Sequence, residues 1–163
     1  MKVRSVLALG GNLGDRRKTI KSAIRAIKSL DGVTLIAKSP LVESHALTEG
    51  GLDESKPNYL NGVVEIETDL KPGDLLDAVR KIEQEHGRIR LERWGSRTLD
   101  IDIITYGNLI KSGRRLELPH PRAFQRSFVL VPWALMNPSA VLLGHGKVAD
   151  LAEPLKHEVW ISE

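Results

Sequence analysis

The sequence predicts an α+β sandwich, because strand and helix patterns follow one another along the chain in a defined order. Apolar runs typical of strands and amphipathic runs typical of helices come as strand, helix, strand, strand, helix, strand. This is the ferredoxin-like split βαβ order, in which a mostly antiparallel sheet carries helices packed on it. With 163 residues, 41% of them hydrophobic, we expect a single domain over residues 1–163.

The first half of the pattern begins with an apolar run at residues 3–9, which predicts a buried strand. Residues 15–30 repeat apolar side chains at helical spacing. Residues 33–42 predict a second strand, in which Pro40 indicates an edge or a bulge. Residues 43–57 have no periodicity, so we expect a loop whose length favours a lid or a binding loop.

The second half contains the clearest helix. Residues 59–68 predict a third strand, and residues 72–86 carry an amphipathic pattern that ends before Gly87. Residues 87–96 form an arginine-rich segment that we expect to be a second loop. Residues 99–106 predict the last strand of the pattern, and the Gly107-Asn108 pair after it indicates a hairpin turn.

The last third of the chain has a weaker pattern. Residues 115–118 predict a short strand, and residues 122–135 predict a helix interrupted by Pro132. Residues 141–163 show no clear periodicity. Near the start of the chain, the run Gly10-Gly11-Asn12-Leu13-Gly14 lacks both the Walker ending and the dinucleotide-binding spacing, so we expect a tight turn between strand and helix there.

Composition narrows the kinds of site that the chain can build. There is no cysteine, so a metal would need oxygen or imidazole ligands, which favours magnesium, calcium or manganese. No apolar run is long enough to cross a bilayer, and the first one is too short for a signal peptide, so we expect a cytoplasmic protein with no membrane partner. The formal net charge of +3 does not by itself indicate nucleic acid.

Two aspartates, Asp100 and Asp102, stand two residues apart in the predicted strand at residues 99–106. Side chains two apart on a strand share a face, so the apolar neighbours face inward and both carboxylates face the other way. Adjacent carboxylates repel unless a cation lies between them, and magnesium usually takes one or two carboxylates plus substrate phosphates. A strand with one solvated face explains the same alternation about equally well.

Arginines surround this strand and favour the metal hypothesis. Four precede it and four follow it, namely Arg88, Arg90, Arg93 and Arg97, then Arg114, Arg115, Arg122 and Arg126. Arginine is preferred where phosphates need planar, two-pronged hydrogen bonding. Acidic groups for a metal beside basic groups for phosphates are what phosphoryl transfer requires, so the pattern indicates a magnesium-dependent transferase.

The run Arg93-Trp94-Gly95-Ser96-Arg97-Thr98-Leu99-Asp100-Ile101-Asp102-Ile103 resembles the signature of the 6-hydroxymethyl-7,8-dihydropterin pyrophosphokinases, enzymes of folate biosynthesis. Weaker matches extend the resemblance over most of the chain: Gly10-Gly11-Asn12-Leu13-Gly14, Tyr59-Leu60-Asn61, Leu118-Pro119-His120 and Arg126-Ser127-Phe128. The resemblance implies transfer of the β,γ-pyrophosphoryl group of ATP to the pterin hydroxymethyl oxygen, with release of AMP. It also implies two magnesium ions and three mobile loops over the site.

The same resemblance assigns roles to individual residues. Asp100 and Asp102 are expected to hold magnesium, and Arg88 and Arg97 to act in catalysis on the phosphates. ATP contacts are expected from Glu83, Arg97, Ile103, Arg115, His120 and Arg126. Pterin contacts are expected from Ser44, Leu47, Tyr59, Asn61, Trp94 and Phe128. Whether an aspartate also accepts the hydroxyl proton is left open, because a metal lowers the pKa of a bound alcohol.

Ordinary structural roles are the alternatives: solvated charges for Glu83 and the arginines, core packing for Tyr59 and Phe128. Arg80 and Pro121 depart from residues frequent in the family. A nucleic-acid-binding module of the same fold would also use arginines and aromatics, but the two aspartates would repel a polyanion. A different magnesium-dependent phosphoryl or nucleotidyl transferase fits the acidic and basic groups as well, and formation of AMP instead of ADP would distinguish pyrophosphoryl transfer from it. No obligate protein partner is expected.

Overall fold

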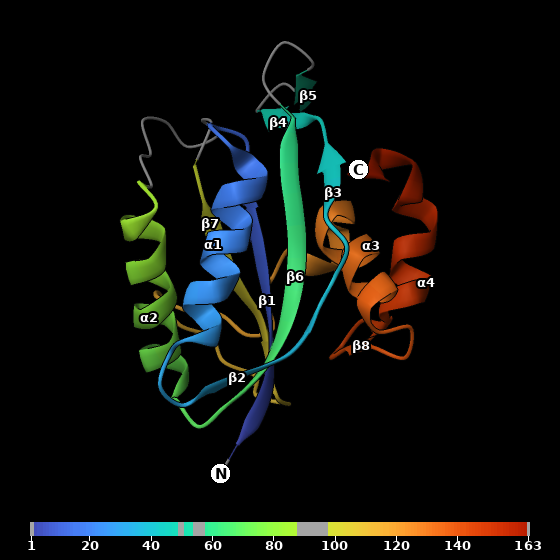
Figure 1. The fold of residues 1–163 in the computed structure, drawn as a ribbon. Helices are drawn as coiled ribbons and strands as arrows, with labels where there is room; N and C mark the ends of the chain where they lie inside the picture. Colours follow the sequence, from blue (N-terminus) through green and yellow to red (C-terminus); the bar gives the residue numbers. More distant parts are fainter. Residues whose placement is uncertain (1, 49–50, 54–57, 88–97, 163) are drawn as a thin grey trace.

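The computed structural model describes residues 2–48, 51–53, 58–87 and 98–162, and it confirms the α+β prediction (Figure 1). The elements are β1 Val3–Gly11, α1 Arg16–Lys28, β2 Val33–Lys38, β3 Val42–Ser44, β4 Ala46–Thr48, β5 Gly51–Asp53, β6 Tyr59–Thr68, α2 Pro72–Glu85, β7 Asp100–Tyr106, α3 Ser127–Met136, β8 Val141–Leu142, β9 Gly146–Lys147, α4 Val148–Ala152 and β10 Val159–Ile161. Two 3-10 turns, Ala123–Gln125 and Glu153–Glu158, precede α3 and β10. The six major elements from β1 to β7 follow the expected ferredoxin-like order.

The central sheet has the order β10-β3-β6-β1-β7, and neighbouring strands in it are antiparallel. The long strand β6 has two partners on one side, because β3 pairs with its first half and β2 with its second half. The predicted strand at residues 33–42 is therefore broken at Pro40, which has no amide hydrogen to donate. Ser39 bridges the break: its backbone N–H donates to the carbonyl of Val63, and its hydroxyl accepts from the N–H of Val63, both at 2.9 Å.

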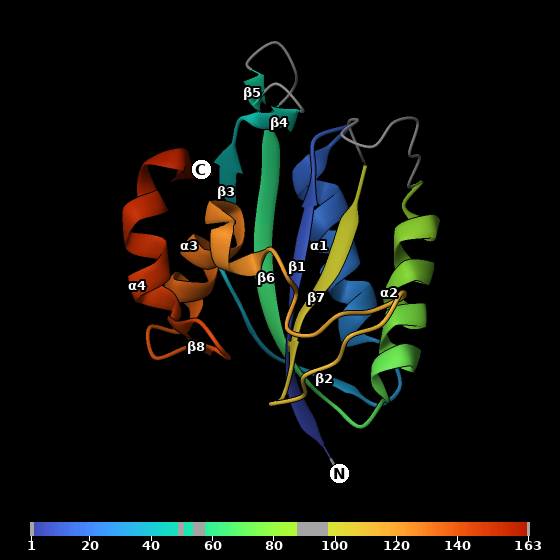
Figure 2. The ribbon, with the colours of Figure 1, turned by 180° about the vertical axis from the view of Figure 1, so that it is seen from behind.

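Helices cover both faces of the sheet (Figures 1 and 2), and the strands β1, β6 and β7 contribute to a core on each face. Side chains alternate along β1: Leu7 and Leu9 pack against α1 and α2, whereas Val6 and Ala8 pack against the α3 and α4 side. The amphipathic pattern of α2 is explained by this arrangement, since its apolar residues Leu75, Leu76, Val79 and Ile82 all lie in the first core.

Several segments differ from expectation. Residues 43–57 are not simply a loop, because residues 42–44 form β3, and β4 pairs with β5 in a separate hairpin. The tail after Val141 contains α4 and β10, and β10 adds to the sheet beside β3. These elements are three to five residues long, which is too short for a periodic signal.

Three smaller corrections concern turns and helix limits. The predicted helix at residues 122–135 starts at Ser127, because Arg126 has an extended backbone; Pro132 lies inside α3 without ending it. Of residues 115–118, Leu118 forms an isolated bridge with Lys111 in place of a strand. Gly10 and Gly11 belong to β1, so the turn lies further on, at residues 12–15. Within the described ranges, none of the helices has the length and apolar character needed to cross a membrane.

Candidate active site

The two aspartates lie on β7, which pairs with β1 at the edge of the sheet. Asp100 pairs with Gly10 and Asp102 pairs with Ala8. The apolar residues on either side of them, Leu99, Ile101 and Ile103, are buried in the core under α1 and α2. Both aspartates are half-buried, and the alternation of the strand places them on the opposite face, toward α3. The predicted division of the strand into an apolar face and an acidic face is confirmed.

Arg126 and Phe128 join Asp102 from the start of α3. The Nη1 atom of Arg126 lies 3.6 Å from Oδ2 of Asp102, and the side chains are 25% and 34% exposed. The guanidinium also lies over the Phe128 ring, with Cζ 5.6 Å from its centroid. A partly solvated ion pair of this length contributes only about 0–1 kcal/mol. Separating the carboxylate from the guanidinium therefore costs little free energy, so the carboxylate is available to bind a cation and the guanidinium to bind a phosphate.

His120 lies next to the same edge of β7. Its backbone N–H donates to the carbonyl of Ile104 at 2.8 Å, and its Nδ1 atom accepts from the backbone N–H of Arg122 at 3.2 Å. Burial lowers the pKa of the imidazole; Asp102 acts in the opposite direction, while Arg126 and Arg122 lower the pKa further. A neutral ring with Nδ1 as acceptor carries its proton on Nε2, which is the tautomer that donates to a phosphate oxygen.

Three of the residues predicted to bind the pterin, Ser44, Tyr59 and Asn61, come from β3 and β6. Ser44 is buried and pairs with Tyr59, the half-buried first residue of β6. Asn61 is 8% exposed, and its Oδ1 atom has no hydrogen-bond partner among the described residues. Because a buried acceptor without a partner is costly, this atom marks a place where a ligand donor would be accommodated.

Gly10 connects the two groups of residues. It pairs with Asn61 on one side of β1 and with Asp100 on the other, so the three residues form one row across the sheet. Neighbouring strands are about 4.8 Å apart, which puts the Asn61 and Asp100 backbones roughly 10 Å from each other. A Cβ atom at position 10 would lie 2.1 Å from Nδ2 of Asn61. The absence of a side chain at Gly10 therefore provides the space that the Asn61 amide occupies.

Three predicted ATP contacts lie away from this row. Ile103 is 3% exposed and packs in the core, while Glu83 is 1% exposed and bonds to the backbone of β7. Arg115 forms an exposed ion pair with Asp77 of α2 and lines a cavity of about 530 Å³ between the start of α2 and residues 109–116. Their contacts with ATP stay predictions.

Other predicted site residues lie outside the described residues: Arg88, Trp94 and Arg97. Leu47 lies in β4, where its backbone pairs with Leu52. Two residues for which the sequence predicted no role in the site lie near the aspartates. The first is Gly10, for which a glycine within a strand was the available signal, since it marks close approach of a neighbour. The second is Arg80, whose spacing from Glu83 is that of a helical ion pair.

The carboxylates of Asp100 and Asp102 suit a hard divalent cation. Among the described residues no group of three His, Cys, Asp or Glu side chains could hold a metal ion. Two carboxylates are nevertheless sufficient for magnesium, which keeps waters or substrate phosphates in its remaining positions. Oxygen ligands next to Arg126 and His120 fit a cation that binds together with a polyphosphate and not alone.

Known proteins identify the family. The family model of 7,8-dihydro-6-hydroxymethylpterin-pyrophosphokinase matches residues 6–138. The 2-amino-4-hydroxy-6-hydroxymethyldihydropteridine pyrophosphokinase of Haemophilus influenzae is 42% identical over 130 residues, which is 80% of this chain and 79% of that protein. The enzyme of the same name from Pseudomonas aeruginosa is 44% identical over 135 residues, covering 83% of this chain and 81% of its own.

A solved structure shows the same fold. The crystal structure of Plasmodium falciparum HPPK-DHPS, with pterin and p-hydroxybenzoate, superposes with a TM-score of 0.73 at 14% identity. The match covers 99% of this chain and 45% of the Plasmodium chain, so this chain spans less than half of that protein. The sequence relatives and the family model together show that the chain belongs to the 7,8-dihydro-6-hydroxymethylpterin-pyrophosphokinase family.

Proposed function

We propose that this pyrophosphokinase uses magnesium held by Asp100 and Asp102, and that the pterin binds beside them on the Asn61 side of Gly10. Family membership gives the reaction: the chain transfers the pyrophosphoryl group of ATP to the hydroxymethyl group of 6-hydroxymethyl-7,8-dihydropterin, in folate biosynthesis. AMP is the other product, because the two terminal phosphates leave ATP together.

The observation that carries the proposal is the row formed by Asn61, Gly10 and Asp100. The open acceptor of Asn61 fits an N–H donor on the edge of a pterin. The hydroxymethyl group of a pterin held there would point across Gly10 toward the aspartates. Tyr59 and Phe128, both half-buried, are proposed to stack on the flat ring.

The phosphates are proposed to bind on the other side of Asp102. A bound magnesium ion supplies charge neutralisation and lowers the pKa of an oxygen that it coordinates. Arg126 then leaves Asp102 for a phosphate oxygen, and the Nε2 proton of His120 donates to another. Arg88 and Arg97 are proposed to act on the transferred group, and Glu83, Ile103 and Arg115 to contact the nucleotide. Trp94, Ser44 and Leu47 complete the proposed pterin set.

Metal binding and product identity test this proposal together. Asp102→Asn keeps the size of the side chain and removes its charge, so Mn²⁺ binding in the presence of α,β-methylene-ATP should weaken by at least about tenfold. Turnover to AMP should be lost, while the melting temperature stays close to that of the parent enzyme. Asp150→Asn, at an exposed position in α4, is the matched control. Unchanged Mn²⁺ binding in Asp102→Asn would refute the assignment of the metal site.

The remaining parts of the proposal concern stoichiometry and setting. We propose that each active site holds two magnesium ions and that residues 1–163 form one pyrophosphokinase domain. We also propose that the protein is cytoplasmic and acts without nucleic acid and without an obligate protein partner. Calorimetric titration with Mg²⁺ and α,β-methylene-ATP measures the first of these: one ion per protein would contradict the two-ion arrangement.

A further inference from the structure

The outer edge of β7 is bonded to two side chains of α2. Oε2 of Glu83 accepts a hydrogen bond from the backbone N–H of Ile101 at 2.7 Å, and Nη1 of Arg80 donates to the carbonyl of the same residue at 3.1 Å. Nη1 of Arg80 also lies 2.8 Å from Oε1 of Glu83. The carboxylate and the guanidinium thus accept and donate where a neighbouring strand would otherwise do so.

We infer that Arg80 and Glu83 are positioning residues, which set the spacing and direction of the Asp100 and Asp102 carboxylates by holding the Ile101 backbone between them. The inference rests on the proposed role of the two aspartates as metal ligands.

The geometry of the backbone gives the reason. The N–H of Ile101 belongs to the peptide plane shared with Asp100, and its carbonyl belongs to the plane shared with Asp102. Between two planar peptide groups only φ and ψ of the middle residue are free to rotate. Bonding one group of each plane to a fixed partner therefore restrains both angles, and with them the relative direction of the two carboxylates.

Glu83, one of the two partners, is itself firmly held. Glu83 is 1% exposed on the buried side of α2, and its helical neighbour Ile82 is also buried in the core between α2 and the sheet. A buried carboxylate needs hydrogen bonds or a cation, and Ile101 and Arg80 provide both. Such a pair adds little net stability compared with apolar residues of the same volume, so its directional bonds to one peptide are its distinctive contribution.

The repulsion between the two aspartates gives a further reason for this role of Arg80 and Glu83. Asp100 and Asp102 repel each other before a cation arrives, and this repulsion tends to twist the strand between them. Arg80 and Glu83 bind the backbone and not the carboxylates, so they oppose the twist without occupying ligand positions. Preorganised ligands bind a cation more tightly, because less ordering remains to be done on binding.

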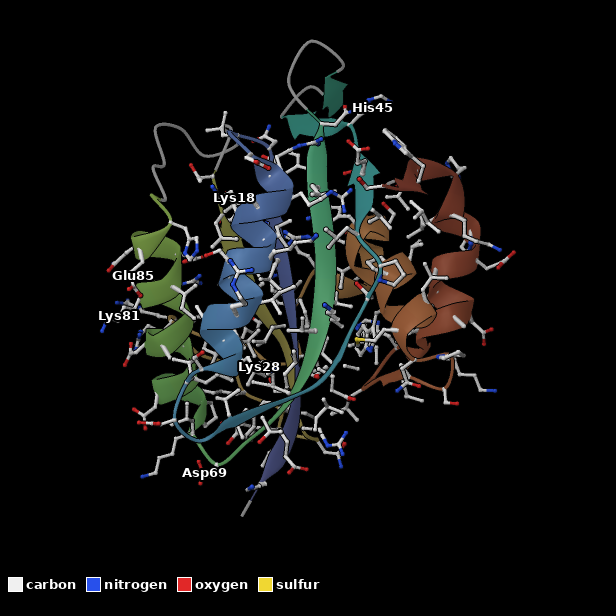
Figure 3. The ribbon with its side chains drawn as sticks, viewed as in Figure 1. Lys18, Lys28, His45, Asp69, Lys81 and Glu85 are labelled. Carbon is white, nitrogen blue, oxygen red and sulfur yellow. The ribbon has the colours of Figure 1, made fainter. Side chains whose placement is uncertain are left out.

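The test compares five variants: two of them each alter one member of the pair, two are matched controls, and one is a conservative replacement. Arg80→Met removes the donor from a side chain that is 40% exposed, and Glu83→Gln removes the charge with little change of volume. Lys81→Met and Glu85→Gln make matched changes at exposed positions of the same helix (Figure 3). Arg80→Lys keeps a charge that can reach one of the two partners, and should rescue part of the effect.

Two readouts separate positioning from stability. The first is the Ile101 amide signal in a ¹H–¹⁵N NMR spectrum without metal, which should move upfield and exchange faster in Arg80→Met and Glu83→Gln. The second is Mn²⁺ binding with α,β-methylene-ATP, which should weaken by about 10- to 100-fold, as expected for outer partners of metal ligands. Pterin affinity should change by less than about twofold, because the proposed pterin contacts include neither Arg80 nor Glu83 nor Ile101.

The outcomes are distinguishable from those of the proposed function. Normal Mn²⁺ affinity in both Arg80→Met and Glu83→Gln would overturn the inference, even if their melting temperatures fell, because the pair would then serve stability alone. If Glu83→Gln does not fold, the comparison of Arg80→Met with Arg80→Lys still decides the matter. Failure of the metal assignment itself would appear separately, as unchanged Mn²⁺ binding in Asp102→Asn.

Discussion

Replacing Gly10 by alanine should weaken pterin binding without touching the substrate directly. The new methyl group would lie 2.1 Å from Nδ2 of Asn61, about 1.3 Å inside an ordinary contact of 3.4 Å, and 3.0 Å from its Cγ atom. The carbonyl of Leu60 lies at 3.4 Å and does not need to move. The strain therefore falls on one side chain, and the Asn61 amide must shift by more than 1 Å.

A shift of this size breaks a hydrogen bond, because bonds of about 2.9 Å weaken steeply when they lengthen or bend. Leaving a buried polar group of the pterin unmatched costs about 1–3 kcal/mol, which corresponds to a loss of roughly 5- to 150-fold in affinity. Overpacking should also lower the free energy of unfolding by about 1–3 kcal/mol. Nucleotide affinity should change little, because the atoms nearest to the new methyl group belong to Asn61 and Leu60, which are not predicted ATP contacts.

Calorimetric titration of the pterin in the presence of Mg²⁺ and α,β-methylene-ATP measures the effect. Gly73→Ala is the matched control, since a Cβ atom there meets nothing within 4 Å. The variant Asn61→Ala and the double variant with Gly10→Ala complete a cycle. If Gly10 acts through Asn61, the double variant binds the pterin as weakly as Asn61→Ala alone; fully additive losses, or a Gly10→Ala affinity within about twofold of the parent, would refute the reasoning.

Three further predictions concern pH, packing and rate. The pKa of His120 is lowered by burial, so as pH falls the unfolded chain binds a proton on this side chain before the folded protein does, and the folded protein loses stability. Between about pH 8 and about pH 5.5, the free energy of unfolding measured by chemical denaturation should therefore fall less in His120→Gln than in the parent. Equal losses would contradict the assigned direction of the pKa shift. Leu7→Ala empties a fully buried position and should cost about 2–5 kcal/mol, whereas Ile110→Ala, at a side chain that is 73% exposed, should cost well under 1 kcal/mol in the same assay. Arg97→Ala should lower the single-turnover rate by a much larger factor than it weakens ATP binding, and equal factors would make Arg97 a ground-state contact.

The acidic strand shows what periodicity predicts well. Alternation places Leu99 and Ile101 on one face and Asp100 and Asp102 on the other. The structure has this arrangement because one face of β7 packs in the core under α1 and α2, whereas on the other face both aspartates are only half-buried. The signal is local, since every residue involved lies within the strand or next to it. The long helix α2 was predictable for the same reason.

Pairings between distant segments were not predictable in this way. Ser44 belongs to a three-residue strand that exists because β6 and β10 lie on either side of it, and β10 is more than a hundred residues away along the chain. Glu83 was a candidate nucleotide contact with a solvated charge as the alternative, yet the structure buries it against β7. The burial of the Glu83 side chain depends on how α2 packs on the sheet, and the residues near position 83 do not determine that packing by themselves.

The position of β10 has a practical consequence for handling the protein. Val159 pairs with Ser44, and Ser44 in turn pairs with Tyr59. Strand β10, near the C-terminus, therefore forms backbone hydrogen bonds with β3, which carries Ser44 of the proposed pterin set. The N-terminal end of β1 lies at the opposite end of the sheet (Figure 1). Affinity tags, fluorophores or fusion partners are therefore best joined before Val3, because that end of the sheet is far from the proposed pterin site.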